Sequence, residues 1–221
     1  MIGERAFTVR GTIGMSDTKE KILLTALRLF ARDGYEAVSV SAIAGELGMT
    51  KGALYKHYKN KRDIFDSIFE RVCREDIERA KKFGVPEEDF EDNPLAFKNT
   101  SMESLRNFIE ATFRIWIENE VARNFRKMLT LEQYRSAEMA ELYQTCILPV
   151  IYIEDLFREM IAQGILRKND PKLLALEFMA PYHFLISAAL ADASFDIEEG
   201  MSLLTAHIDR FIEINQNPQN R

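Results

Sequence analysis

Cysteine and histidine are scarce in this sequence, and the shortage excludes several kinds of functional site. The 221 residues include only two cysteines, Cys73 and Cys146, with no CxxC pair, so neither a zinc site nor a disulfide framework is expected. The three histidines stand in no metal-binding spacing and in no catalytic pattern with serine or cysteine. A glycine-rich phosphate loop is missing as well. We therefore expect no enzyme activity, no metal and no cofactor.

Long uninterrupted apolar runs are also missing. The N-terminus lacks the apolar core of a signal peptide. Residues 173–191 are nearly long enough to span a bilayer, but Glu177, Pro181 and His183 interrupt them. We interpret this stretch as a helix buried by protein, and the cysteine usage as that of a cytoplasmic protein.

Alternating β-branched runs are absent, whereas apolar residues recur at spacings of three and four almost throughout. This pattern predicts an all-α fold. Glycines, prolines and capping residues divide the chain into about nine helices. The expected ranges are 17–32, 40–47, 51–58, 61–83, 101–116, 121–130, 136–163 with a kink at Pro149, 171–192 and 198–214. Segment 84–99, which is rich in acidic residues, is expected to be a mobile loop.

Charge is distributed unevenly along the chain. The whole chain has a net charge of -6, which by itself argues against nucleic-acid binding. Residues 1–62, however, carry eleven basic and six acidic residues, whereas the remainder carries 18 basic and 29 acidic ones. A basic N-terminal end on an acidic body fits a protein with one DNA-facing end. Five basic residues and no acidic residue lie between Thr50 and Arg62, namely Lys51, Lys56, Lys59, Lys61 and Arg62.

Residues 39–62, SVSAIAGELGMTKGALYKHYKNKR, have the pattern of a helix-turn-helix. Ser39 is placed to cap a short helix, Gly48 to make the turn, and Thr50 to cap a second short helix. This is the smallest unit that can place a helix in the DNA major groove. Leu54 is expected to be a core residue that orients the second helix.

Residues 18–69 resemble the DNA-binding domain of the TetR (tetracycline-repressor) family. The matching elements are ALRLFARDGY, SVSAIAGELGMTKGALYKHY and KNK. The resemblance implies an all-α homodimer with an N-terminal three-helix DNA-binding domain and a C-terminal helical domain for ligand binding and dimerisation. The corresponding domains are a disordered or non-native arm (1–15), the helix-turn-helix domain (16–62), the helical domain (63–215) and a tail (216–221).

The resemblance also suggests which residues contact DNA. The first turn of the recognition helix reaches base edges. Lys51 is the best candidate for a base contact, because lysine donates to guanine, although a phosphate contact is the alternative. Gly52 would permit a close backbone approach to DNA, and Ala53 would touch a thymine methyl. The expected DNA-binding set is Thr25, Ser39, Ser41, Thr50, Lys51, Gly52, Ala53, Tyr55, Lys56, His57 and Lys61.

Most other members of this set are expected to hold phosphates. Tyr55, His57 and Lys61 are the expected anchors, and Thr25 and Lys56 are further backbone contacts. Ser39 either caps its helix only or also meets a phosphate. Ser41 occupies a position at which similar proteins often carry a base-reading side chain.

The middle of the chain holds more aromatic residues than a minimal core requires. We expect some of them to line an apolar effector pocket with a few polar tips, and ordinary core packing is the alternative. Pro181 would kink its helix and open space there, and Glu177 is a candidate partner for a cationic ligand. The expected ligand-binding set is Phe108, Phe113, Trp116, Tyr143, Phe178, Tyr182 and His183.

The last two helices, 171–192 and 198–214, are apolar almost all round. A dimer is expected because two DNA-binding heads are needed to read a palindrome, and we expect each of these two helices to pair with its symmetry mate in a four-helix bundle. The alternative is that the two helices pack only inside one subunit. The sequence thus predicts a dimeric, ligand-responsive regulator that binds a double-stranded palindromic operator and is released by a small apolar or aromatic effector. A repressor is favoured. The alternative is a constitutive DNA-binding protein with no effector.

Overall fold

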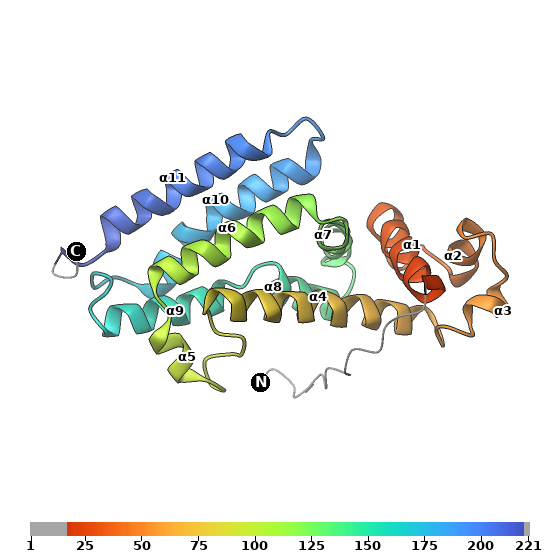
Figure 1. Cartoon of the computed structure of the whole chain (residues 1–221), viewed down its shortest axis with the longest axis horizontal. Helices are drawn as coiled ribbons and strands as arrows, with labels where there is room; N and C mark the ends of the chain where they lie inside the picture. Colours follow the sequence, from red (N-terminus) through yellow and green to blue (C-terminus); the bar gives the residue numbers. More distant parts are fainter. Residues whose placement is uncertain (1–16, 219–221) are drawn as a thin grey trace. The chain divides into compact units, whose positions relative to one another are not determined.

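The computed structural model describes residues 17–218, and these residues form eleven α-helices (Figure 1). The described residues contain no strand beyond one isolated bridge between Leu166 and Gln216. The predicted all-α class is therefore confirmed. The helices are α1 (Asp17–Asp33), α2 (Val40–Glu46), α3 (Lys51–Leu54), α4 (Lys61–Phe83), α5 (Pro94–Asn99), α6 (Met102–Glu118), α7 (Glu120–Glu132), α8 (Ala137–Cys146), α9 (Val150–Ala162), α10 (Pro171–Ala191) and α11 (Ile197–Asn215).

The helices form two compact units. The head unit consists of the residues up to Asp76 together with Asn124–Ala140, and the body unit consists of Ile77–Arg123 together with the residues from Glu141 onward. The chain therefore passes from one unit to the other within α4, α7 and α8. The predicted arm lies outside the described residues. The predicted division by function, with its boundary after residue 62, stays a prediction.

Local hydrogen bonds set the limits of the helices in the head unit. The Ser39 hydroxyl accepts the N–H of Ala42 at 3.1 Å, and the Thr50 hydroxyl accepts the N–H of Ala53 at 3.2 Å. Both side chains thus satisfy donors at the first turn of a helix that would otherwise lack partners. Gly48 makes the turn between α2 and α3 at a φ of 63°, in the left-handed region that favours glycine.

The recognition helix α3 is shorter than expected, because regular helix ends at Leu54 instead of continuing to Tyr58. Residues 55–57 continue as turns, in which the His57 N–H donates to the Leu54 carbonyl at 2.9 Å. After these turns, Asn60 caps α4 by accepting the N–H of Asp63 at 2.8 Å. Leu54 and Tyr58 are both buried, so α3 stays anchored in the head unit despite its length.

An aromatic core holds the body unit together. The Phe157 ring stacks on Phe211 at 5.3 Å between centroids, and Phe178 meets both rings edge-on at 5.4 and 4.9 Å. These three residues come from α9, α10 and α11, so one cluster joins three helices. Helices α6, α10 and α11 lie side by side in this unit (Figure 1).

The prediction of a loop over residues 84–99 is wrong for its last six residues, which form α5. Asn93 caps this helix by accepting the N–H of Ala96 at 3.3 Å, and Pro94 occupies its first turn. The Phe97 ring is completely buried, 5.3 Å from the Tyr152 ring. Tertiary burial of this aromatic side chain stabilises a helix that would be too short to persist alone.

The prediction of one kinked helix over residues 136–163 is also wrong, since the chain breaks into α8 and α9. Pro149 has no N–H to donate, and its ring disfavours a helical conformation at Leu148. The N–H groups of Ile147 and Leu148 both donate to the Tyr143 carbonyl, at 2.9 and 3.2 Å. Regular helix resumes at Val150.

Candidate nucleic-acid interface

The first turn of α3 presents an open surface. Lys51 and Gly52 are exposed, and Ala53 is half-buried. A Cβ atom added at Gly52 would meet nothing closer than the Thr50 hydroxyl oxygen, at 4.0 Å. The fold of the chain therefore does not require glycine at this position. Glycine would be required here if another molecule approached the backbone closely, because glycine has no side chain.

Two residues of the expected DNA-binding set contact each other on α3. The Lys51 ammonium lies over the Tyr55 ring, 5.7 Å from its centroid, and Tyr55 is 44% exposed. Such a cation–π contact at an exposed site contributes about 0.5–1 kcal/mol. An interaction of this size holds the lysine only weakly near the start of the helix.

Lys61 makes internal contacts that the sequence did not predict. Its ammonium donates to the carbonyl of Tyr35 at 2.7 Å and to that of Glu36 at 3.3 Å. It also lies 4.2 Å from the centroid of the Tyr35 ring. With 23% of its side chain exposed, Lys61 stabilises the loop between α1 and α2. A phosphate contact by the same ammonium stays a prediction.

The remaining expected DNA contacts lie in several local environments. Ser39, Ser41, Thr50 and Lys56 are exposed, and the hydroxyls of Ser39 and Thr50 act as helix caps. Thr25 and His57 are half-buried. Their DNA roles stay predictions.

Not every basic residue of segment 51–62 is free to meet an anion. Arg62 donates to Asp66 and to Glu138, each at 2.7 Å, and the hydrogen bond that the Glu138 carboxylate accepts is the main reason that the pKa of Arg62 is raised. Lys51, Lys56 and Lys59 are exposed. The exposed positive charge of this segment therefore comes mainly from these three lysines.

Glu132 is a residue of the head unit that sequence reasoning missed. Its carboxylate is 1% exposed and accepts the N–H of Tyr35 at 2.9 Å, across 97 residues of sequence. Arg135 lies 3.0 Å from the same oxygen. No local pattern marks this glutamate, because its partner is distant in the sequence.

The residues of the expected effector set are mostly packed in the body unit. Phe113, Trp116, Phe178 and Tyr182 are buried, and Phe108, Tyr143 and His183 are half-buried. The Phe113 and Tyr182 rings are 6.2 Å apart. A surface cavity of about 300 Å³ in this unit is lined by other residues, namely Phe83, Asn107, Glu110, Ala111, Arg114 and Met201. The role of the seven expected residues stays a prediction.

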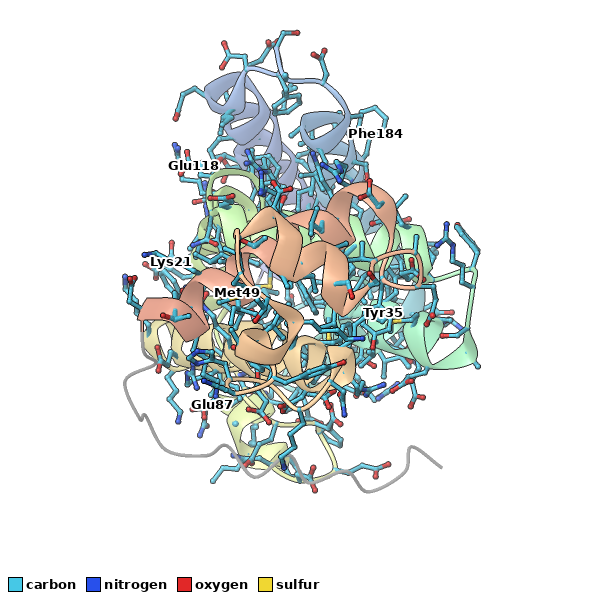
Figure 2. The ribbon with its side chains drawn as sticks, turned by 90° about the vertical axis from the view of Figure 1, so that its right-hand side faces the viewer. Lys21, Tyr35, Met49, Glu87, Glu118 and Phe184 are labelled. Carbon is cyan, nitrogen blue, oxygen red and sulfur yellow. The ribbon has the colours of Figure 1, made fainter. Side chains whose placement is uncertain are left out.

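An apolar face of α10 and α11 is exposed. Phe184 is 72% exposed and lies at the surface (Figure 2). Leu173 and Leu176 on α10, and Leu203 and Ile214 on α11, are exposed as well. In length and composition alone, α10 is the one helix among residues 17–218 that would suffice to cross a membrane, a test that core helices of soluble proteins also pass.

Comparison with known proteins identifies the helix-turn-helix. Residues 22–68 match the family model described as bacterial regulatory proteins of the tetR family. Residues 22–68 are therefore a DNA-binding domain of the TetR family. Within residues 17–218, no group of three or more histidine, cysteine or acidic residues is arranged to hold a metal ion.

Individual relatives share this likeness. The chain is 27% identical over 170 residues to the uncharacterised HTH-type transcriptional regulator YhgD of Bacillus subtilis, covering 77% of this chain and 83% of that protein. It is 44% identical over 54 residues to the HTH-type transcriptional regulator AcrR of Shigella flexneri, covering 24% of this chain and 25% of AcrR. Both relatives are described as regulators of transcription.

Solved structures share the fold of this chain over nearly its whole length. The structure of SmeT, the repressor of the Stenotrophomonas maltophilia multidrug efflux pump SmeDEF, has a TM-score of 0.61 at 23% identity, over 95% of this chain and 93% of that one. A SmeT–triclosan complex has a TM-score of 0.64 at 22% identity, over 92% and 93%. At these identities the likeness establishes the fold.

Proposed function

We propose that this chain is a TetR family regulator that represses transcription by binding a palindromic operator as a dimer and leaves it when a small, largely apolar or aromatic effector binds. The observation that carries the DNA-binding part is the open first turn of α3. Lys51 and Gly52 are exposed there on a helix that the Thr50 cap and the buried Leu54 hold in place. N-terminal residues of a recognition helix are those that reach base edges. A cytoplasmic location accompanies this function.

Within this interface, Lys51, Gly52 and Ala53 read bases, while Tyr55, His57 and Lys61 anchor phosphates. Phosphate contacts supply affinity without sequence information, whereas contacts with base edges supply specificity. Ser39 and Thr50 cap helices whose N-termini favour an anion nearby. Thr25, Ser41 and Lys56 complete the proposed surface.

The proposed dimer interface is the exposed apolar face of α10 and α11. A monomer would leave Phe184 and four other large apolar side chains of these helices in water. Pairing with a second copy around a two-fold axis buries the same patch on both chains. Two heads about 34 Å apart then read the two halves of a palindrome, which gives useful specificity.

Effector control would act as a population shift. The effector binds the body better in a conformation whose heads do not match the operator, and only this difference in affinity can drive release. Helix α4 belongs to both units and is the proposed link. The complex of SmeT with triclosan supports a small-molecule effector for a protein of this fold.

Selection of duplexes from a random-sequence library by the purified protein tests this function. We expect enrichment of a palindrome, and binding of two chains per duplex by sedimentation. Compounds that shift the melting temperature are then added to the complex, and true effectors are expected to release the DNA. Enrichment of no duplex would refute DNA binding, and a stabilising compound that binds equally well with and without the palindrome would refute effector control.

A constitutive DNA-binding protein without an effector is the second candidate. The burial of Phe113, Phe178 and Tyr182 favours it, because buried aromatic rings of this kind also make an ordinary core. The two candidates differ in a thermal-shift screen of apolar and aromatic compounds. Ligand-induced stabilisation is expected for the effector-controlled repressor and not for the constitutive protein.

A further inference from the structure

Glu132 is a buried carboxylate outside the proposed DNA-contacting surface. Its side chain is 1% exposed, and the Oε1 atom accepts the Tyr35 N–H at 2.9 Å while facing Arg135 Nη1 at 3.0 Å. The same atom would lie 2.6 Å from a Cβ at Gly34, so the carboxylate occupies space that only glycine leaves free. A buried charge is costly unless it is paired and hydrogen-bonded. The contacts of the Glu132 carboxylate must therefore compensate for the cost of burying its charge.

The backbone that Glu132 contacts is the corner between α1 and α2, which we define as residues 34–36. At this corner the N–H of Tyr35 is bound by Glu132 of α7, and its carbonyl is bound by Lys61 of α4 at 2.7 Å. The Tyr35 ring packs edge-on against Phe30 at 5.1 Å and Phe65 at 5.2 Å. Side chains from two other helices thus hold both backbone polar groups of one residue. The α1–α2 corner is consequently a fixed point of the head unit.

Segment 124–140 makes two further contacts inside the head unit. Arg62 Nη2 of α4 lies 2.7 Å from the Glu138 carboxylate, and the Phe69 and Phe125 rings are 6.2 Å apart. This segment includes most of α7, whose first residues, 120–123, belong to the body unit. The α1–α2 corner is thus bound to a helix that continues into the body unit, in addition to its attachment to α4.

We propose that Glu132 is a positioning residue for operator binding. By holding the α1–α2 corner against α7, it restricts the directions that the helix-turn-helix can take relative to the rest of the chain. In a dimer this restriction selects one spacing of half-sites, because a freer head must lose that freedom on binding. The inference rests on the proposed function and adds to it a determinant that does not touch DNA.

Three substitutions separate the contributions of Glu132. Glu132→Ala and Glu132→Leu both remove the hydrogen-bond acceptor, the second with little loss of volume, whereas Glu132→Gln keeps an acceptor of the same shape. Glu198→Ala is the matched control, because it removes a carboxylate that is bidentate to Arg114, at 2.7 and 2.8 Å, in the body unit. The DNA probes are the palindromic duplex selected by the wild-type protein, versions with one base pair inserted at or deleted from its centre, and a single half-site.

We expect Glu132→Ala and Glu132→Leu to bind the palindrome at least tenfold more weakly, and to lose most of the preference for it over the altered spacings. Binding to the single half-site should stay within about twofold of wild type. Glu132→Gln should restore most of the spacing preference, and Glu198→Ala should behave as wild type. Hydrogen exchange of the Tyr35 amide should be faster in the first two variants, with α1 still protected.

Several results would overturn the proposal. A folded Glu132→Leu protein that keeps the wild-type preference for one half-site spacing would do so. An equal loss of affinity for the half-site and for the palindrome would also do so, because it would indicate damage to the helix-turn-helix itself. Loss of folding in both the Ala and Leu variants would assign Glu132 to stability alone. Failure of the wild-type protein to select any duplex is a different outcome, because it would refute the proposed function and the inference together.

Discussion

The ammonium group of Lys61 lies 2.7 Å from the carbonyl oxygen of Tyr35 and therefore has a hydrogen-bond partner within the protein itself. The same contact places the positive charge beside the C-terminal end of α1, where a cation is favourable. Lys61 thus has a structural role that can be measured separately from its proposed phosphate contact.

Replacement of Lys61 by alanine should affect both stability and DNA binding. Loss of hydrogen bonds from a charged group is expected to lower the free energy of unfolding by about 2 kcal/mol in urea titrations. Affinity for operator and scrambled duplexes should fall by similar factors. The slope of log affinity against log salt concentration should decrease in magnitude by about one, which corresponds to the loss of one phosphate contact. Lys172→Ala, at an exposed lysine of the body unit, is the control. An unchanged salt dependence would leave Lys61 with its structural role only.

Replacement of Lys51 by alanine should have a different signature. The residue is exposed and its contact with Tyr55 is weak, so the free energy of unfolding should change by less than about 1 kcal/mol. Discrimination between the operator and a duplex with one changed base pair should fall by about 1–3 kcal/mol, as measured by competition binding. A uniform loss of affinity across all duplexes would instead identify Lys51 as a phosphate contact.

Gly52→Ala tests whether DNA needs the open space at the start of α3. Alanine is the better helix former by about 1 kcal/mol, and its Cβ would have room here, so the melting temperature should rise or stay constant. Affinity for the selected palindrome should nevertheless fall at least about tenfold, a loss of roughly 1.4 kcal/mol. Gly45→Ala is the matched control, since nothing lies within 4 Å of its added Cβ either. Undiminished affinity of the Gly52 variant would contradict the close approach.

Phe184→Glu tests the apolar face of α10 and α11. A charge in the centre of a packed symmetric interface lacks a partner, so the variant should sediment as a monomer at concentrations at which the wild-type protein is a dimer. Ile151→Glu is the matched control, because Ile151 and Phe184 are both 72% exposed but Ile151 lies on α9. The Ile151→Glu protein should remain dimeric. A dimeric Phe184→Glu protein would place the interface elsewhere.

Much of the head could be predicted from the sequence because its signals are local. Ser39, Gly48 and Thr50 act on backbone groups within three residues of themselves, so their residue types suffice to place two helices and the turn between them. The same locality explains the errors in the body. Phe97 forms part of a helix only because Tyr152, far along the chain, covers it. The sequence predicts a kink at Pro149, but the break that is found there depends on the alternative hydrogen-bond partner of residues 147 and 148.

The sequence by itself determined the all-α class, the helix-turn-helix and the exposed first turn of its recognition helix, since periodicity, caps and turn residues act over a few positions. Only the tertiary structure decided that Lys61 binds the Tyr35 carbonyl and that Glu132 binds the Tyr35 N–H. It also decided that aromatic residues of the body form a dense core and that Phe184 is left exposed. The physical reason is that burial and the pairing of buried charges depend on which distant segments the fold brings together.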